Sequence, residues 1–293
     1  MDKKASDERP EQLAPAAVIT GATRGIGRAL ADEFAKGGHT LLLVARDEAG
    51  LAKTASEIAA EHGVRVQHVA CDLSIAEGCD AVEDALREHG LYAESLINNA
   101  AVLTAGFFQD QEREDLLRII DLNVRAVVDL TSRFLPDMLA RDCGGVLNVA
   151  SVEGFMPVPY QSTYAATKAC MISLSRALAY EGMGTNVRVC VVTPGPVETD
   201  IHANAGAEHS HYVRYYPVMT PEQMAQAAYK RFMRGNWVIT EGWVNRITAF
   251  GVRFLPGIMH IPAAGWFFRV RDADGNPQMP KPLPMPLPRK PKQ

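Results

Sequence analysis

The chain alternates short, continuously apolar runs with longer stretches in which apolar residues recur every three to four positions. The short runs predict strands covered on both faces, and the periodic stretches predict amphipathic helices. The predicted strands are residues 16–19, 39–45, 64–70, 95–97, 146–150, 186–193 and 237–240. The predicted helices are residues 28–36, 51–62, 76–89, 112–140, 163–181 and 220–234. This alternation predicts an α/β fold with a doubly wound parallel sheet.

The segments before and after these predicted strands and helices differ in composition. Residues 1–14 are charged and lack apolar periodicity, which predicts a disordered lead-in before a single domain at 15–245. Residues 246–271 are strongly apolar with arginines at their edges. Residues 272–293 alternate proline with other residues, which predicts an extended polyproline tail.

Two interpretations of the apolar segment 246–271 stay open. The first is a helical extension that packs over a substrate cleft or against a partner subunit. The second is an interfacial segment whose aromatic side chains enter the headgroup region of a membrane. Pro256 and Pro262 are expected to break any single helix there.

Composition and charge restrict the function classes. Hydrophobic residues make up 47% and charged residues 22% of the chain, which is ordinary for a globular protein. A formal net charge of -4 gives no basic field for nucleic acid. The five cysteines lack metal-site spacing, no signal peptide is recognisable, and no uncharged apolar run could span a membrane. We therefore expect a cytoplasmic protein without a structural zinc site.

A glycine-rich turn, T-G-A-T-R-G-I-G, joins the first strand to the first helix at residues 20–27. Its glycines let the backbone approach a pyrophosphate, whose charge is favoured by the free N–H groups of the following helix. The turn therefore predicts a nucleotide site, although tight turns also need glycine for geometry alone. The residues assigned to it are Gly21, Thr23, Arg24, Gly25, Ile26 and Gly27.

The stretch from 148 to 168 places a serine, a tyrosine and a lysine together. Tyr164 and Lys168 are four residues apart among helix formers, so both side chains leave one helix face. An adjacent ammonium group lowers the pKa of a phenol, which would let Tyr164 act as a general acid or base. Ser151 follows a buried strand and should emerge at its carboxyl end, where ligands collect. A surface tyrosine–lysine pair is the alternative.

These motifs together resemble the short-chain dehydrogenase/reductase family over roughly residues 15–245. The resemblance rests on motifs in the family's order: T-G-x-x-x-G-x-G, Asp72-Leu73, N-N-A-A at 98–101, Asn123, Ser151, Tyr164-x-x-x-Lys168 and Pro194-Gly195. The family has N-N-A-G where this chain has N-N-A-A, so the last alanine adds a methyl group near the cofactor. The resemblance implies a Rossmann-like fold and hydride transfer between a nicotinamide dinucleotide and a carbonyl group.

The resemblance also implies roles for single residues. Tyr164 would be the acid/base, and Lys168 would bind the nicotinamide ribose and lower the tyrosine pKa. Ser151 would polarise the carbonyl, Asn123 would hold a proton-relay water, and Asp72 would meet the adenine. Further residues expected along the cofactor are Leu73, Asn99, Ala100, Pro194, Gly195, Val197 and Thr199.

The end of the second strand bears on the choice between NAD(H) and NADP(H). In the family's register Ala45 occupies the position of the acid that selects NAD, and Arg46 follows it. Arg24 could approach the same group, so two arginines are available for a 2′-phosphate. We expect NADP(H) as the cofactor. The alternative is that Asp47 or Glu48 contacts the ribose.

Residues 200–217 carry three histidines and three tyrosines without clear periodicity, and we expect a loop that covers the substrate. His209 and His211 lack a third ligand at usable spacing, so solvated histidines are expected in preference to a metal site. The aromatic and apolar content favours a hydrophobic ketone, with an acyl chain or a steroid-like ring.

An alternative function is an NADP-binding redox sensor or scaffold, but such a protein has no use for the phenol–ammonium pair. The helices at 112–140 and 163–181 have apolar residues on more than one side. Because the family commonly pairs these helices between subunits, we expect a homodimer or homotetramer.

Overall fold

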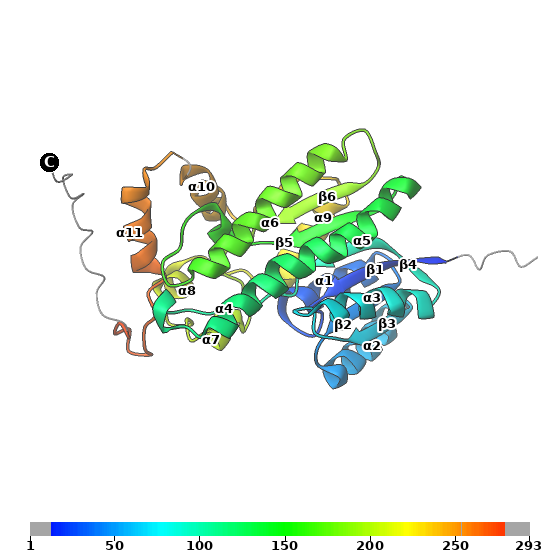
Figure 1. The fold of residues 1–293 in the computed structure, drawn as a ribbon, viewed down its shortest axis with the longest axis horizontal. Coiled ribbons are helices and arrows are strands. Elements are labelled where there is room, and N and C mark those ends of the chain that lie inside the picture. Colours follow the sequence, from blue (N-terminus) through cyan, green and yellow to red (C-terminus); the bar gives the residue numbers. More distant parts are fainter. Residues whose placement is uncertain (1–12, 253, 279–293) are drawn as a thin grey trace, which may run out of the picture.

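Seven parallel strands form one sheet in the order β3-β2-β1-β4-β5-β6-β7 (Figure 1). The structure is a computed structural model that describes residues 13–252 and 254–278. The strands are β1 (Ala14–Thr20), β2 (Leu41–Ala45), β3 (Val66–Ala70), β4 (Leu91–Asn98), β5 (Gly145–Val149), β6 (Arg188–Val192) and β7 (Val238–Ile239). The strand order reverses between β1 and β4, so a crevice is expected outside their carboxyl ends.

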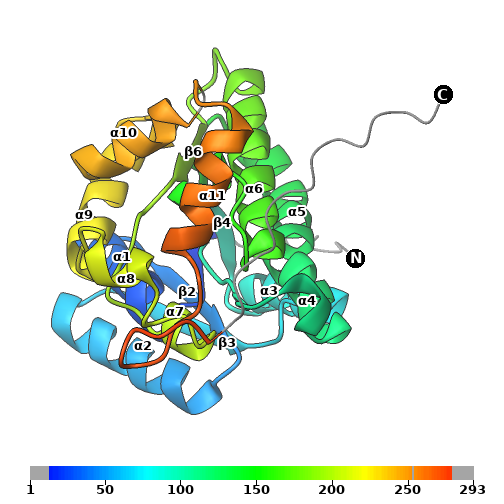
Figure 2. The same ribbon diagram turned by 90° about the vertical axis from the view of Figure 1, so that its left-hand side faces the viewer.

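Helices cover both faces of the sheet, with α1, α2 and α9 on one side and α3, α5 and α6 on the other (Figure 2). Their bounds are α1 (Gly25–Lys36), α2 (Glu48–His62), α3 (Ala76–Glu88), α5 (Ala126–Arg141), α6 (Ser162–Glu181) and α9 (Pro221–Phe232). The side chains of β1 show why its sequence is continuously apolar. Ala17 and Ile19 pack toward α1, whereas Ala16 and Val18 pack toward α3 and α5. The predicted doubly wound fold is therefore confirmed.

Strand β4 is longer than the predicted strand at 95–97 because its first half follows a different pattern. Leu91 and Ala93 are buried, while Tyr92 and Glu94 between them are partly exposed. This alternation of two residues marks a strand with one covered face, and a search for continuous apolar runs misses it. The added residues pair with the first residues of β1.

The predicted helix at 112–140 is interrupted by a π-helical turn. Helix α4 (Arg113–Ile120) leads into the π turn Asp121–Arg125, which continues into α5. In this turn the N–H group of Ala126 donates to the carbonyl of Asp121, five residues earlier. Such single turns are frequent at functional sites, and this one contains the buried Asn123.

Four further helices follow β6 and form one end of the molecule, with α9 between the first two and the last two (Figure 1). They are α7 (Ile201–Asn204), α8 (His211–Tyr215), α10 (Trp243–Gly251) and α11 (Gly257–Phe267). The segment 200–217, expected to be a loop, contains the two short helices α7 and α8. The predicted boundary after Asn245 falls inside α10.

The two prolines of the apolar segment behave differently. Pro256 caps the start of α11, so the helix breaks there as predicted. Pro262 lies inside α11, so the second expected break was wrong. Proline removes one backbone N–H donor, and the helix continues on both sides of it. The predicted lead-in and tail lie mostly outside the described residues, although Ala14, assigned to the lead-in, begins β1.

Candidate active site

A cleft of about 1080 Å³ opens at the carboxyl ends of the strands. This exceeds the upper end of the range for small-molecule pockets, roughly 300–1,000 Å³, so it can hold a dinucleotide with a second molecule beside it. All the predicted site residues line this cleft except Asn123. The sequence therefore placed the site at the crevice where the strand order reverses.

The glycine turn forms the floor of the cleft below the start of α1. Gly21 and Gly25 adopt the left-handed φ values of 68° and 56°, which favour glycine. A Cβ atom on Gly27 would lie 2.1 Å from the carbonyl oxygen of Gly21 and 2.4 Å from the Asn99 amide nitrogen. The turn thus brings bare backbone and the helix N-terminus to the cleft, which fits a pyrophosphate.

Asn99 and Thr20 fix the glycine turn against β4. The Asn99 amide donates to the carbonyl of Thr20 over 2.9 Å. The Thr20 hydroxyl accepts from the backbone N–H groups of Asn99 at 2.9 Å and Ala100 at 3.0 Å. Asn99 therefore fixes the position of the glycine turn, and its side-chain amide is already hydrogen-bonded to the protein backbone.

The outer end of the cleft is rich in charge. Arg24 lies 3.3 Å from the carboxylate of Asp200, and both side chains are largely exposed. Arg46 is exposed at the end of β2. Burial alone would raise the pKa of Asp72, but hydrogen bonds from Ser74 outweigh it and the pKa is lowered. Two arginines at this end fit an anionic group on the adenosine side.

The three central residues come from two elements. Ser151 follows β5, and Tyr164 and Lys168 lie on α6. All three are buried, and the ammonium nitrogen of Lys168 donates to the carbonyl of Val149 over 2.9 Å. That nitrogen lies 5.4 Å from the centroid of the Tyr164 ring. The structure thus brings the predicted serine, tyrosine and lysine to one wall of the cleft.

Asn123 lies behind this wall and is fully buried. Its amide nitrogen donates to the carbonyl of Val102 over 3.0 Å and to the hydroxyl of Thr167 over 3.2 Å. Its oxygen accepts from the N–H group of Val102. The side chain therefore joins the π turn to α6 and to the loop after β4. The role expected for Asn123, holding a proton-relay water, stays a prediction.

A carboxyl group that the sequence analysis missed lies beside these residues. Glu153 is 1% exposed, lines the cleft, and its Oε2 atom has no hydrogen-bond partner among the described residues. Burial raises the pKa of Glu153 to about 8, while the charge of Lys168 acts in the opposite sense. Burial lowers the pKa of Lys168 to about 8. In the sequence Glu153 is one acid after a strand, where most acids are solvated, so no signal marked it.

The pKa of Tyr164 differs from the sequence-based prediction. The ammonium group of Lys168 was expected to lower it, but the structure gives the opposite direction. Burial raises the pKa of Tyr164, the carboxyl of Glu153 raises it further, and a hydrogen bond with Ser151 only partly offsets this. The reason is desolvation, because burial of the ring disfavours the charged phenolate.

The region 200–217 forms the outer wall of the cleft. His202 is buried, and burial lowers the pKa of its imidazole to about 4. His211 packs on Trp266 with ring centroids 4.1 Å apart. Tyr212 lines the cleft and stacks on Phe268 at 4.3 Å. The expectation of solvated histidines was therefore wrong for His202, because α7 and α8 fold this region inward.

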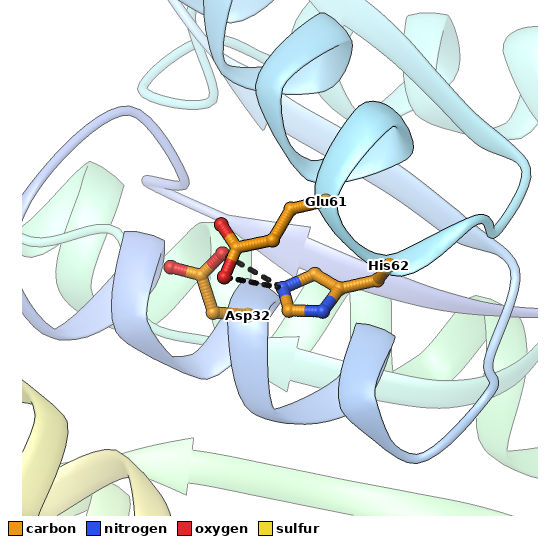
Figure 3. A group of neighbouring side chains, drawn as sticks. All are labelled: Asp32, Glu61 and His62. Atoms are coloured by element: carbon orange, nitrogen blue, oxygen red, sulfur yellow. Dashed lines mark ion pairs between the residues drawn. The ribbon is translucent and has the colours of Figure 1, made fainter.

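Among the described residues, one cluster of three potential metal ligands lies away from the cleft, between α1 and α2 (Figure 3). The Nε2 atom of His62 lies 3.6 Å from Asp32 and 3.8 Å from Glu61. The guanidinium group of Arg28 already pairs with Asp32 over 3.1 Å. Because that positive charge opposes a cation, we interpret the cluster as ion pairs that tie the end of α2 to α1.

Residues 15–210 match the family described as short chain dehydrogenase. The chain belongs to this family. This short-chain dehydrogenase is similar to the 11-beta-hydroxysteroid dehydrogenase A of Sesamum indicum, with 30% identity over 264 residues that cover 86% of this chain and 74% of the relative.

Solved structures of the family include members with either cofactor. A short-chain dehydrogenase from Sphingobium yanoikuyae in complex with NADPH has 35% identity and a TM-score of 0.73, covering 84% of this chain and 95% of that one. A short-chain dehydrogenase/reductase from Burkholderia phymatum in complex with NAD has 27% identity and a TM-score of 0.73, covering 82% and 92%. The solved relatives therefore include both an NADPH complex and an NAD complex.

Proposed function

We propose that this short-chain dehydrogenase uses NADP(H) to reduce a hydrophobic ketone. The observation that carries the proposal is the grouping of Ser151, Tyr164 and Lys168 on one wall of a cleft whose floor is the glycine turn. A dinucleotide fits the residues present, because Gly27 has no room for a side chain and the start of α1 points its N–H groups into the cleft.

When bound, the nicotinamide group supplies the hydride. Tyr164 passes its phenolic proton to the carbonyl oxygen of the substrate, and Ser151 donates a hydrogen bond to the same oxygen. Proton transfer of this kind contributes about 10²- to 10⁴-fold to the rate. Because the pKa of Tyr164 is raised, its phenol is protonated at neutral pH. A protonated phenol is the form that donates a proton during reduction of a ketone.

The preference for NADP(H) rests on the charge at the outer end of the cleft. Ala45 ends β2 without a carboxylate, while Arg46 and Arg24 both line the cleft. A 2′-phosphate would gain charged hydrogen bonds from two guanidinium groups, whereas a ribose hydroxyl would gain little. The NADPH complex of the Sphingobium yanoikuyae relative supports this preference.

The substrate wall supports a hydrophobic ketone. Tyr212 and Leu103 line the cleft on the side of the central residues, and Phe268 stacks behind Tyr212. Similarity to a hydroxysteroid dehydrogenase is consistent with a steroid-like ring, and an acyl chain would suit the same wall. We also propose a cytoplasmic location, which the free state of the five cysteines supports.

We propose that the protein forms a homodimer or homotetramer through α4, α5 and α6. The outer faces of α4 and α5 leave Leu117 41%, Ile120 44% and Val128 45% exposed. Covering these side chains with a second copy would remove apolar surface from water.

A screen of ketones against the purified protein tests the proposed function. The absorbance of NADPH should fall with at least one hydrophobic ketone and should stay constant with Tyr164→Phe. Binding of NADPH without turnover of any steroid or acyl-chain ketone would favour the redox sensor or scaffold instead.

A further inference from the structure

Helices α10 and α11 and the turn between them present an apolar surface to solvent. Most of the large hydrophobic side chains that are more than half exposed in the described part of the chain belong to these two helices and the turn between them. They are Trp243 at 73%, Ile247 at 61%, Phe250 at 65%, Phe254 at 71%, Ile258 at 69%, Met259 at 59% and Trp266 at 52%. We call these seven side chains the apolar face. Exposed patches of this kind mark interaction sites in soluble proteins.

The spacing of these residues shows that the exposure follows a helical pattern. Trp243, Ile247 and Phe250 are separated by four and three residues, and therefore lie along one side of α10. Asn245 on the opposite side of the same helix is 4% exposed and packs against Gly195, beside the cleft. Helix α10 is thus amphipathic in the usual sense, except that its apolar side points away from the protein.

Helix α11 is divided in the same way. Ala264 and the adjoining Phe268 are buried against Tyr212, which lines the cleft. Ile258 and Met259 remain exposed on the outer side. The two helices lie at the end of the molecule that faces the viewer in Figure 2, away from α2 and β3. The inner side of the pair therefore packs against residues that line the cleft, and its outer side is exposed.

The charge around the apolar face identifies its partner. Between Glu241 and Asp272 the sequence has no acidic residue and four arginines, of which Arg269 and Arg271 are buried. The last fifteen residues, 279–293, which lie outside the described residues, add three lysines and an arginine and no acid. Arg246 and Arg231 share the single carboxylate of Glu241, so this group keeps a positive charge. Aromatic and aliphatic side chains flanked by cations match an anionic lipid surface.

A second copy of the chain fits the apolar face less well. Across a two-fold axis the same surface meets itself, so each positive region would approach its equal without an acid to neutralise it. No helix among the described residues is long and apolar enough to cross a membrane. We propose that α10 and α11 lie in the surface of an anionic membrane, with the apolar face in the headgroup region.

Vesicle sedimentation with the full-length protein tests this proposal. Vesicles of phosphatidylcholine with about one third phosphatidylserine should carry the protein into the pellet, and phosphatidylcholine alone should carry much less. The double variant Phe250→Glu with Phe254→Glu should reduce the partition coefficient by at least ~10-fold, because it places two carboxylates in the headgroup region. Both side chains are exposed, so folding should be preserved, and the circular dichroism spectrum checks this.

A matched control introduces two glutamates at exposed hydrophobic positions outside the apolar face. Ile75 and Met183 are 52% and 60% exposed and lie outside α10 and α11. The double variant Ile75→Glu with Met183→Glu should pellet as the wild type does. Wild-type protein that stays in the supernatant with anionic vesicles would overturn the proposal, as would equal losses in both double variants. If light scattering shows a dimer that only the Phe250/Phe254 variant splits, a second copy covers the face and the proposal is wrong.

Discussion

Arg46→Asp should change the cofactor preference of the protein more than its turnover. Arg46 is exposed at the end of β2 and lines the cleft. Its charge is one of the weaker causes of the lowered pKa of Asp72, after the hydrogen bonds from Ser74. Its exposed guanidinium group can still bind a phosphate. Arg24 is partly engaged, because it already lies 3.3 Å from Asp200. We expect Arg46 to contribute the larger share of phosphate binding.

The magnitude follows from the loss of one charged hydrogen bond, which contributes about 1.5–3 kcal/mol. At 1.36 kcal/mol per factor of ten, a loss of about 2 kcal/mol lowers kcat/KM for NADPH by roughly 30-fold. The new carboxylate repels the phosphate and increases this loss. The value for NADH should change by less than ~3-fold, because a ribose hydroxyl carries no charge to repel.

Parallel assays with both cofactors and one ketone measure this difference, and the dissociation constants of both cofactors give a second reading that needs no substrate. Lys53→Asp is the matched control, since Lys53 lies on α2 outside the cleft and its side chain is 78% exposed. It makes the same change of charge and should leave both cofactors unaffected. Equal losses for NADPH and NADH in Arg46→Asp, or a wild-type preference for NADH, would refute the assignment.

Three further outcomes follow from the structure. Gly27→Ala should abolish measurable binding of either dinucleotide by isothermal titration calorimetry, because the new Cβ would lie 2.1 Å from the Gly21 carbonyl oxygen; unchanged affinity would contradict this geometry. Glu153→Gln should become more stable relative to wild type as pH rises from 5 to 8. The raised pKa of Glu153 makes the folded wild type bind more protons than the unfolded chain in this window, so wild-type stability falls as pH rises, and an unfolding-temperature difference constant with pH would disprove it. Light scattering at micromolar concentration should give a mass of at least a dimer, and Val128→Glu on the exposed side of α5 should lower it, whereas a monomeric wild type excludes the proposed assembly.

The fold could be predicted from the sequence because strands covered on both faces are continuously apolar and helices are periodic. Leu41 to Val44 are fully buried in β2, and that pattern is visible without a structure. The first half of β4 and the π turn could not be found in the same way. The first half of β4 alternates buried and partly exposed residues, because only one face of the strand is covered there. The π turn has no sequence pattern of its own. Its polar Asn123 is stabilised by contacts with Val102 and Thr167, which are distant in sequence.

The positions of the site residues could be predicted, but their environments could not. The spacing of Tyr164 and Lys168 shows that they share a helix face, yet it does not show how deeply both are buried. Burial reverses the expected direction of the Tyr164 pKa. It also shifts the pKa values of Glu153 and His202, which line the same cleft. These are tertiary effects, because desolvation depends on which elements pack over a side chain.

Turnover of Tyr164→Phe tests the central claim most directly. The phenylalanine keeps the ring but removes the hydroxyl that we assign as the proton donor to the substrate oxygen. With NADPH and a ketone that the wild type reduces, turnover should fall by at least ~10²-fold, while the dissociation constant for NADPH stays within about threefold of the wild-type value. Turnover close to that of the wild type would contradict the assignment of Tyr164 as the proton donor.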